Sequence, residues 1–143
     1  MAKWDPPTFI QYAKAQCPAH VVNVMEDLVN YTVDESDKVS WGRGEETGML
    51  TFKARYDEGR LPLFSITTDG QIKLYVNYLR EKQIAREILR DYQLKMESTF
   101  LLELDEDIYP HDVFHPLDDL FHTQSQVEKF KHAIMGVTAR LHQ

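Results

Sequence analysis

The fold is decided by residues 61–78, which read LPLFSITTDGQIKLYVNY. The dipeptide Asp69-Gly70 accepts a positive φ at both central positions of a type I′ turn, and such a turn joins two antiparallel strands. After it, polar and apolar residues alternate over residues 71–78, as in a strand with one buried face. Before it, residues 61–68 are rich in β-branched and large apolar side chains, which also favours a strand. We therefore predict a tight hairpin at Asp69-Gly70.

Two further runs upstream extend this hairpin into an antiparallel meander. Residues 50–56 alternate in the same way, and the turn after them offers Gly59 for a left-handed backbone. A short strand at 38–41 precedes them and is followed by a glycine-rich stretch at 41–48. That stretch matches neither a dinucleotide fingerprint nor a Walker motif, so we predict a bulged hairpin loop. The result is a meander of about four strands.

Two helices are predicted before the meander. The first begins at Thr8, where Thr8 and Gln11 form a capping box after two prolines. The second covers about 19–33, because its apolar residues keep helical spacing. Residues 1–7 are expected to be flexible.

Two more helices are predicted after the meander. Apolar residues four apart predict a central helix over about 80–95, and Thr123 with Gln126 marks the start of a C-terminal helix. Between them, 98–116 is expected to be an irregular acidic loop, or a short extra strand near Phe100. The sequence thus predicts an α+β fold with two N-terminal helices, one central helix and one C-terminal helix packed on the meander.

The composition is that of one soluble domain. The 143 residues are 43% hydrophobic and 27% charged, and we expect a single α+β domain over 1–143. A single cysteine, Cys17, allows no internal disulfide, and the N-terminus has no apolar signal segment. We therefore expect a cytoplasmic protein. The net charge of −7, with cations scattered among acids, argues against nucleic-acid binding, and no apolar run suggests a membrane span.

Three features together resemble a known bacterial module. They are the run Ser40-Trp41-Gly42-Arg43-Gly44, the hairpin 63–72, and Pro116-Leu117 with Leu120 before the last helix. The module has the order helix, Trp-Gly-x-Gly loop, β-meander, helix, loop, helix, and is often joined to other domains. Its function is uncharacterised, and the resemblance covers the chain from about Val21 onward. It implies an accessory or regulatory protein in bacteria, and it carries over no catalytic residue.

The outer face of the meander is the predicted interaction site. Aromatic and cationic residues there alternate with the expected core residues, which is typical of surfaces that bind proteins. We expect a separate protein or a second copy of this chain, giving a homodimer, as the partner. A non-catalytic protein-interaction or regulatory module that needs no cofactor is therefore the first functional hypothesis. The residues concerned are Trp41, Arg43, Lys53, Arg55, Lys73, Tyr75 and Asn77.

A metal-dependent hydrolase or nuclease is the alternative hypothesis. Acidic and histidine residues cluster at 107–122, and on one helix His115, Asp119 and His122 would present three ligands on one face. Pro110 and Pro116 interrupt such a helix.

Three weaker patterns are also present in the sequence. Asp57 or Asp69 with Lys73 approximates a nuclease motif, but a glutamine replaces its second carboxylate. Cys17 is a potential nucleophile, although it sits near the end of a short helix rather than at an N-terminus. A small-ligand pocket lined by Phe64, Ile88 and Phe130 is more simply interpreted as core.

Overall fold

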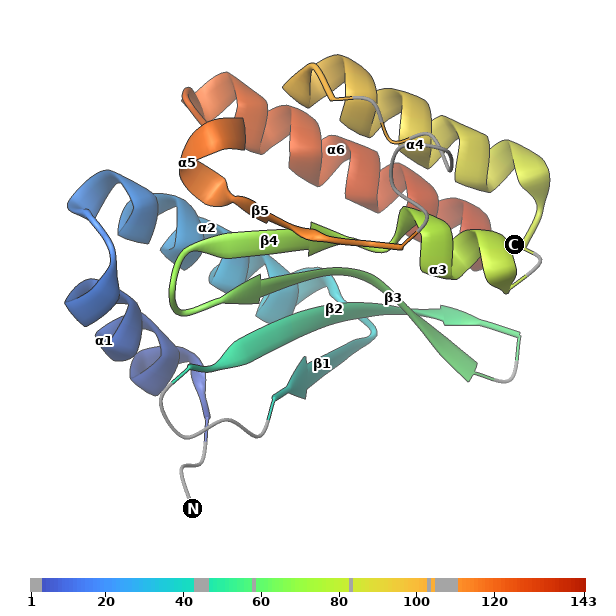
Figure 1. Ribbon diagram of the computed structural model, residues 1–143. Helices are drawn as coiled ribbons and strands as arrows, with labels where there is room; N and C mark the ends of the chain where they lie inside the picture. Colours follow the sequence, from blue (N-terminus) through green and yellow to red (C-terminus); the bar gives the residue numbers. More distant parts are fainter. Residues whose placement is uncertain (1–3, 43–46, 58, 83, 103, 105–110) are drawn as a thin grey trace.

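The protein is described by a computed structural model that covers residues 4–42, 47–57, 59–82, 84–102, 104 and 111–143. Six helices and five strands follow one another along the chain in these described ranges (Figure 1). They are α1 (Pro6–Gln16), α2 (Ala19–Glu35), β1 (Lys38–Trp41), β2 (Met49–Tyr56), β3 (Gly59–Thr67), β4 (Gln71–Leu74), α3 (Val76–Glu81), α4 (Arg86–Phe100), β5 (Phe114–Pro116), α5 (Leu117–Leu120) and α6 (Gln124–Leu141).

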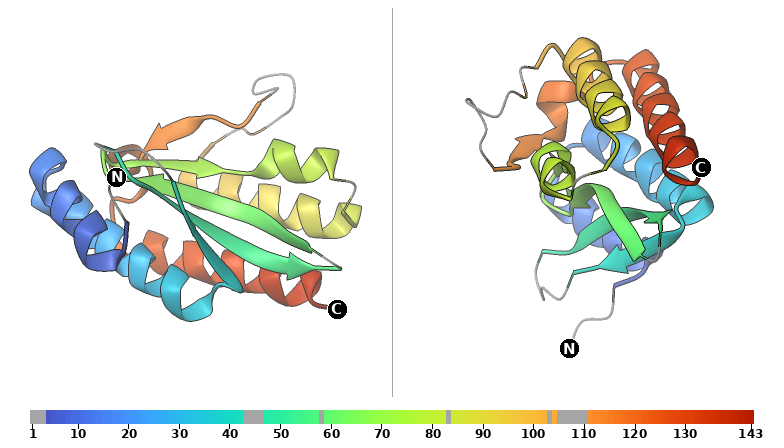
Figure 2. Two further views of the ribbon diagram at one scale, coloured as in Figure 1. Left: turned by 90° about the horizontal axis from the view of Figure 1, so that it is seen from below. Right: turned by 90° about the vertical axis from the view of Figure 1, so that its right-hand side faces the viewer.

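The predicted α+β fold is confirmed, with one more strand than expected. The strands form one antiparallel sheet in the order β1-β2-β3-β4-β5. Helices α2 and α6 cross one face of this sheet, and α4 lies beside α6 (Figures 1 and 2). We call the opposite face, which none of these three helices covers, the open face. No helix in the described ranges has the length and apolar character needed to cross a membrane.

The core lies between the sheet and these helices. Phe52 and Phe64 stack across β2 and β3 with their ring centroids 5.3 Å apart, and Phe130 of α6 meets Phe64 edge-on at 4.9 Å. All three side chains are fully buried. Aromatic pairs of this geometry add to the stabilisation that burial alone provides. The interpretation of Phe64 and Phe130 as core residues rather than the lining of a small-ligand pocket is therefore confirmed.

The hairpin at Asp69-Gly70 is confirmed, but its turn differs from the prediction. Only Gly70 has a positive φ, at 86°, and its N–H donates to the Thr67 carbonyl at 3.0 Å. This is a type I turn followed by a left-handed residue, which closes a three-residue loop. In the preceding hairpin, Asp57 takes the positive φ of 51° that we had assigned to Gly59.

Strand β4 ends earlier than the alternation of 71–78 predicted. The N–H of Tyr75 donates to the Leu63 carbonyl, and the chain then forms α3. The Asp112 carboxylate accepts the N–H groups of Asn77 and Tyr78 at 2.8 and 2.9 Å, so it caps the helix from a distant segment. Such a long-range cap leaves no local pattern in the sequence.

The helix ends agree only partly with their predictions. The N-cap of α1 is Asp5, whose carboxylate accepts the Thr8 N–H, so the predicted Thr8 capping box does not form. Trp4, in the segment expected to be flexible, is only 6% exposed. The capping box of Thr123 and Gln126 at the start of α6 is confirmed.

The segment 98–116 contains the missed strand. Helix α4 continues to Phe100, so no strand starts there, and β5 instead pairs with β4 through Gln71 and Pro116. A three-residue strand is too short to show the period-two pattern on which sequence prediction depends.

Replacing Gly70 by alanine should destabilise the protein by about 1–2 kcal/mol, because alanine is strained at a positive φ. Its Cβ would also come within 3.0 Å of the Cys17 sulfur. Gly59→Ala is the matched control, since a Cβ there meets no atom within 4 Å. Urea unfolding of the two variants tests this, and an equal free energy of unfolding in both would contradict it.

The stability of the protein should also depend on Asp37 at acid pH. Burial raises the pKa of this carboxyl, but the N–H of Arg55 and the side chain of His142 outweigh that effect and lower it overall. A lowered folded-state pKa stabilises above the unfolded value of 3.8, and the benefit is lost as the pH falls through the folded value. The free energy of unfolding of wild type should therefore exceed that of Asp37→Asn at about pH 6. This difference should be smaller at about pH 2. Urea unfolding at both pH values measures this, and a constant difference would contradict it.

Candidate functional site

Of the predicted interaction residues, Lys53, Lys73 and Tyr75 come together on the open face. Lys73 pairs with Ser65 across β3 and β4, and Ser65 pairs with Thr51 of β2, so these positions form one row across the sheet. The Tyr75 hydroxyl reaches back to this row and lies 2.8 Å from the Ser65 hydroxyl. Tyr75 thus lies between the other two residues, because its ring contacts Lys73 and it lines one hollow with Lys53.

Two more of the predicted residues line hollows beside Tyr75: Trp41 lines one with Lys53, and Asn77 lines another with Lys73. The Trp41 ring is 5.9 Å from Phe9 of α1, and Trp41 also lines the hollow that contains Lys53 and Tyr75. Arg55 is exposed near the far end of β2. Asn77 is only 8% exposed, and its side chain accepts a hydrogen bond from Arg80 within α3. Arg43 lies outside the described residues.

A chain of three hydroxyl groups forms the floor of the site. The Thr51 and Ser65 oxygens are 2.6 Å apart, and the Ser65 and Tyr75 oxygens are 2.8 Å apart. Thr51 and Ser65 are both buried. Because three hydroxyl protons serve two links, one proton is left to donate outside the chain. A free proton on the central Ser65 would be buried without an acceptor, so the spare donor belongs at the Thr51 or Tyr75 end.

Next to the hydroxyl chain, a cation lies between two aromatic rings. The Lys73 ammonium is 5.3 Å from the centroid of Tyr75 and 5.4 Å from that of Phe114 on β5. Tyr78 of α3 meets Tyr75 edge-on at 5.9 Å, and the Lys82 ammonium is 5.0 Å from the Tyr78 centroid. We call these five residues, Lys73, Tyr75, Tyr78, Lys82 and Phe114, the cation–aromatic strip. Each cation–ring contact stabilises this arrangement by about 0.5–1 kcal/mol at an exposed site.

Two hollows border the pair Tyr75 and Tyr78. The first, the strand depression, holds about 300 Å³ over β1, β2 and β3. The second, the α3 depression, holds about 190 Å³ and includes Lys73, Glu81 and Asp112. The strand depression is lined by Ser40, Trp41, Gly42, Met49, Thr51, Lys53, Arg60, Pro62, Tyr75 and Tyr78.

The two hollows differ in charge. The lining of the strand depression includes two cations, Lys53 and Arg60, and none of its ten described residues is acidic. The α3 depression has both signs of charge. In a chain with 23 acidic and 16 basic residues, the described lining of the strand depression is therefore locally positive.

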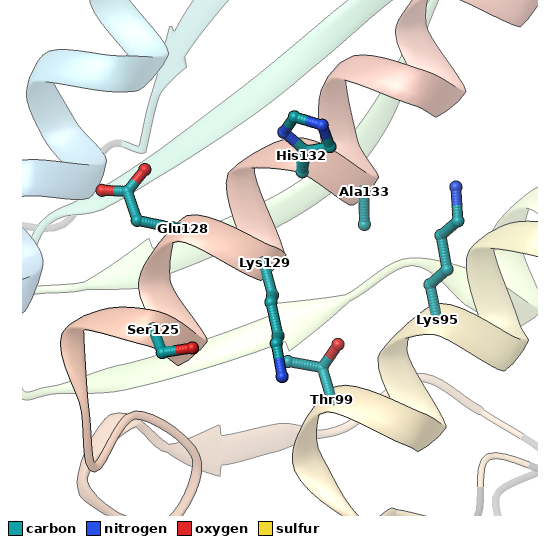
Figure 3. Close-up of a pocket in the computed structure, with 7 residues that line it drawn as sticks. All are labelled: Lys95, Thr99, Ser125, Glu128, Lys129, His132 and Ala133. Carbon is teal, nitrogen blue, oxygen red and sulfur yellow. The ribbon is translucent and has the colours of Figure 1, made fainter.

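A further groove lies on the other side of the molecule, between α4 and α6. It holds about 390 Å³ and is lined by Lys95, Thr99, Ser125, Glu128, Lys129, His132 and Ala133 (Figure 3). Glu128 points away from Lys95 in this view, and the side chains do not converge on one point. The groove therefore does not bring its side chains together at one centre.

The predicted metal ligands do not share a helix. His115 lies in β5, Asp119 in the four-residue α5, and His122 after it, so the spacing on which the metal hypothesis relied does not apply. Burial lowers the pKa of His115, and the nearby Asp119 partly offsets this. Within the described residues, no group of three or more His, Cys, Asp and Glu side chains could hold a metal ion. Asp107, in the same predicted cluster, is outside these residues.

Cys17, Asp69 and Lys73, the other candidate nucleophile and nuclease residues, each contact neighbouring groups in the structure. The Cys17 thiol donates to the Thr68 carbonyl at 3.4 Å, and burial raises its pKa, with Asp69 adding to the shift. A raised pKa reduces the thiolate fraction that nucleophilic attack requires. Asp69 accepts a hydrogen bond from Thr67 within the turn, and Lys73 lies between its two rings.

Sequence reasoning missed Arg60, Tyr78 and Phe114. Arg60 follows a turn glycine and had no distinguishing pattern. Tyr78 reaches the site only because α3 replaces the end of the predicted strand, and Phe114 only because β5 pairs with β4. Alternation along β2 and β3 does place Thr51 and Ser65 opposite the core residues, so period two could have found the hydroxyl chain.

Comparisons with known proteins identify no relative: no family model, curated protein or solved structure matches the chain. The resemblance to a bacterial module therefore stays a prediction beyond its α+β fold. The candidate site has to be interpreted from its own geometry.

Tyr75→Phe should destabilise the protein by about 1 kcal/mol, because it removes the hydrogen bond to Ser65 and keeps the ring. Tyr78→Phe is the control, since the Tyr78 hydroxyl forms no hydrogen bond with a described residue. Thermal and urea unfolding measure the difference. Equal stabilities would mean that the hydroxyl chain does not hold Tyr75 in place.

Proposed function

We propose that this protein is a non-catalytic binding module that recognises an acidic surface of a partner protein through the open face of its sheet. The observation that carries this proposal is the cation–aromatic strip. Its Lys73 lies between two rings, and Tyr78 and Phe114 are 37% and 38% exposed. Exposed aromatic side chains with adjacent cations are typical of residues that dominate binding energies.

The strip is also held in place before binding, which favours recognition. The Tyr75 hydroxyl is tied to Ser65, and the start of α3 is fixed by the Asp112 carboxylate. Groups that are already ordered lose less conformational entropy when a partner docks. An acidic partner is supported by charge, because Lys73 and Lys82 are both on the strip and the neighbouring strand depression is positive.

The edge of the sheet adds an apolar component. Val113 and Phe114 are exposed, 39% and 38% respectively, where β5 forms one edge. Exposed apolar residues next to a polar rim are common at protein interfaces. The proposed partner therefore has acidic residues around an apolar contact.

The double variant Lys73→Glu with Phe114→Ala should abolish partner binding, since it reverses the central charge and removes an exposed ring. We expect a loss of at least about 2 kcal/mol, or about thirtyfold in affinity. Affinity capture with the tagged chain, followed by titration of the captured protein, measures this. Light scattering tells a separate partner from a second 16.8 kDa copy.

The matched control is Lys95→Glu with Leu94→Ala on α4. It makes the same two kinds of change on the helix side, where Leu94 is 53% exposed. The proposal would be contradicted if the control weakened partner binding as much as the strip variant does. It would also be contradicted if the strip variant left partner binding intact.

A further inference from the structure

The strand depression has the size and lining of a small-molecule site. Binding a small molecule would be a role beyond protein binding. Its volume of about 300 Å³ is at the lower end of the range of known ligand pockets. Part of its wall is apolar, from Met49, Pro62 and the rings of Tyr75 and Tyr78. Such a wall suits a compact organic body rather than a bare inorganic ion.

The polar part of the wall consists of hydrogen-bond donors. Lys53 and Arg60 line the depression, and neither forms an ion pair with a described residue. The hydroxyl chain adds its spare proton at Thr51 or Tyr75, both of which also line the depression. A guanidinium, an ammonium and a hydroxyl donor around one hollow match an oxyanion, because arginine can bind two anionic oxygens at once.

The charge of the depression selects against other ligands. None of its described lining residues supplies a carboxylate oxygen, the ligand that divalent cations prefer. Lys53 and Arg60 would repel an organic cation. A neutral apolar ligand would leave both cations without a counter-charge.

We propose that the strand depression binds a small organic anion, whose carboxylate or phosphate is held by Lys53 and Arg60 and whose apolar body packs on Tyr75, Tyr78 and Met49. Carboxylate and phosphate share the oxyanion chemistry that this site recognises. The site shares Tyr75 and Tyr78 with the cation–aromatic strip. Its cations are different, because Lys73 and Lys82 do not line the depression.

The test is an NMR titration of ¹⁵N-labelled protein with phenyl phosphate, phenylacetate and the neutral control benzyl alcohol. We expect saturable shifts at the amides of Thr51, Lys53 and Tyr75, with a Kd below about 1 mM for at least one anion. The tighter of the two anions identifies the natural headgroup as phosphate or carboxylate. Benzyl alcohol should bind at least about tenfold more weakly, because it lacks the charge.

Variants then tie the binding to the proposed residues. The variant Lys53→Gln with Arg60→Gln should weaken anion binding at least about tenfold. Neither side chain belongs to the buried core, so the fold should tolerate both changes. Tyr75→Phe should weaken anion binding less than this double variant, because it removes one hydroxyl donor and leaves both cations in place. Lys129→Gln is the control, since it removes a cation from the α4–α6 groove instead.

Three results would overturn the inference: no saturable binding, equal affinity for benzyl alcohol, or unchanged affinity in the Lys53 and Arg60 variant. Shifts centred on the α4–α6 groove would overturn it as well. Phe114→Ala alone separates this inference from the proposed function, because Phe114 belongs to the cation–aromatic strip and does not line the depression. It should weaken partner binding and leave phenyl phosphate binding within about twofold.

Discussion

The carbonyl group of Leu63 joins three parts of the molecule. Leu63 is the extra residue of a bulge, because Phe52 pairs with Phe64 while Lys53 pairs with Pro62. On its other side, Leu63 lies opposite Tyr75, one position beyond the Phe64–Leu74 pair of β3 and β4. Its carbonyl accepts the buried hydroxyl of Tyr92 from α4 and the N–H of Tyr75. Burial, with a further contribution from Asp112, raises the pKa of Tyr92, which keeps that hydroxyl a proton donor.

The Leu63 carbonyl fixes the position of Tyr75. Tyr75 in turn positions its neighbours on the open face. Its N–H is fixed at Leu63 and its hydroxyl at Ser65, so both ends of the residue are held. Its ring then contacts Lys73 and Tyr78 and separates the strand depression from the α3 depression. The Leu63 carbonyl thus links the packing of α4 to the surface that we propose for binding.

The sequence predicted the parts of the structure that depend on local pattern. Alternation identified β2, β3 and β4, and the Thr123 capping box identified the start of α6. Features that depend on distant partners were missed. Helix α3 is capped by Asp112 across 35 residues, and β5 is recognised only by its pairing with β4. The same division applies to the site, because Lys53, Lys73 and Tyr75 follow from alternation, whereas Tyr78 and Phe114 need the tertiary fold.

The most direct test of the account is amide hydrogen exchange at Tyr75 in wild type and in Tyr92→Phe. The account predicts that the wild-type amide exchanges as slowly as the amides of the paired strands, because it is bonded to the Leu63 carbonyl. Loss of the Tyr92 hydroxyl should speed its exchange by more than it speeds exchange along β2. A Tyr75 amide that exchanges as fast as an exposed loop in wild type would contradict the claim that Leu63 fixes the site.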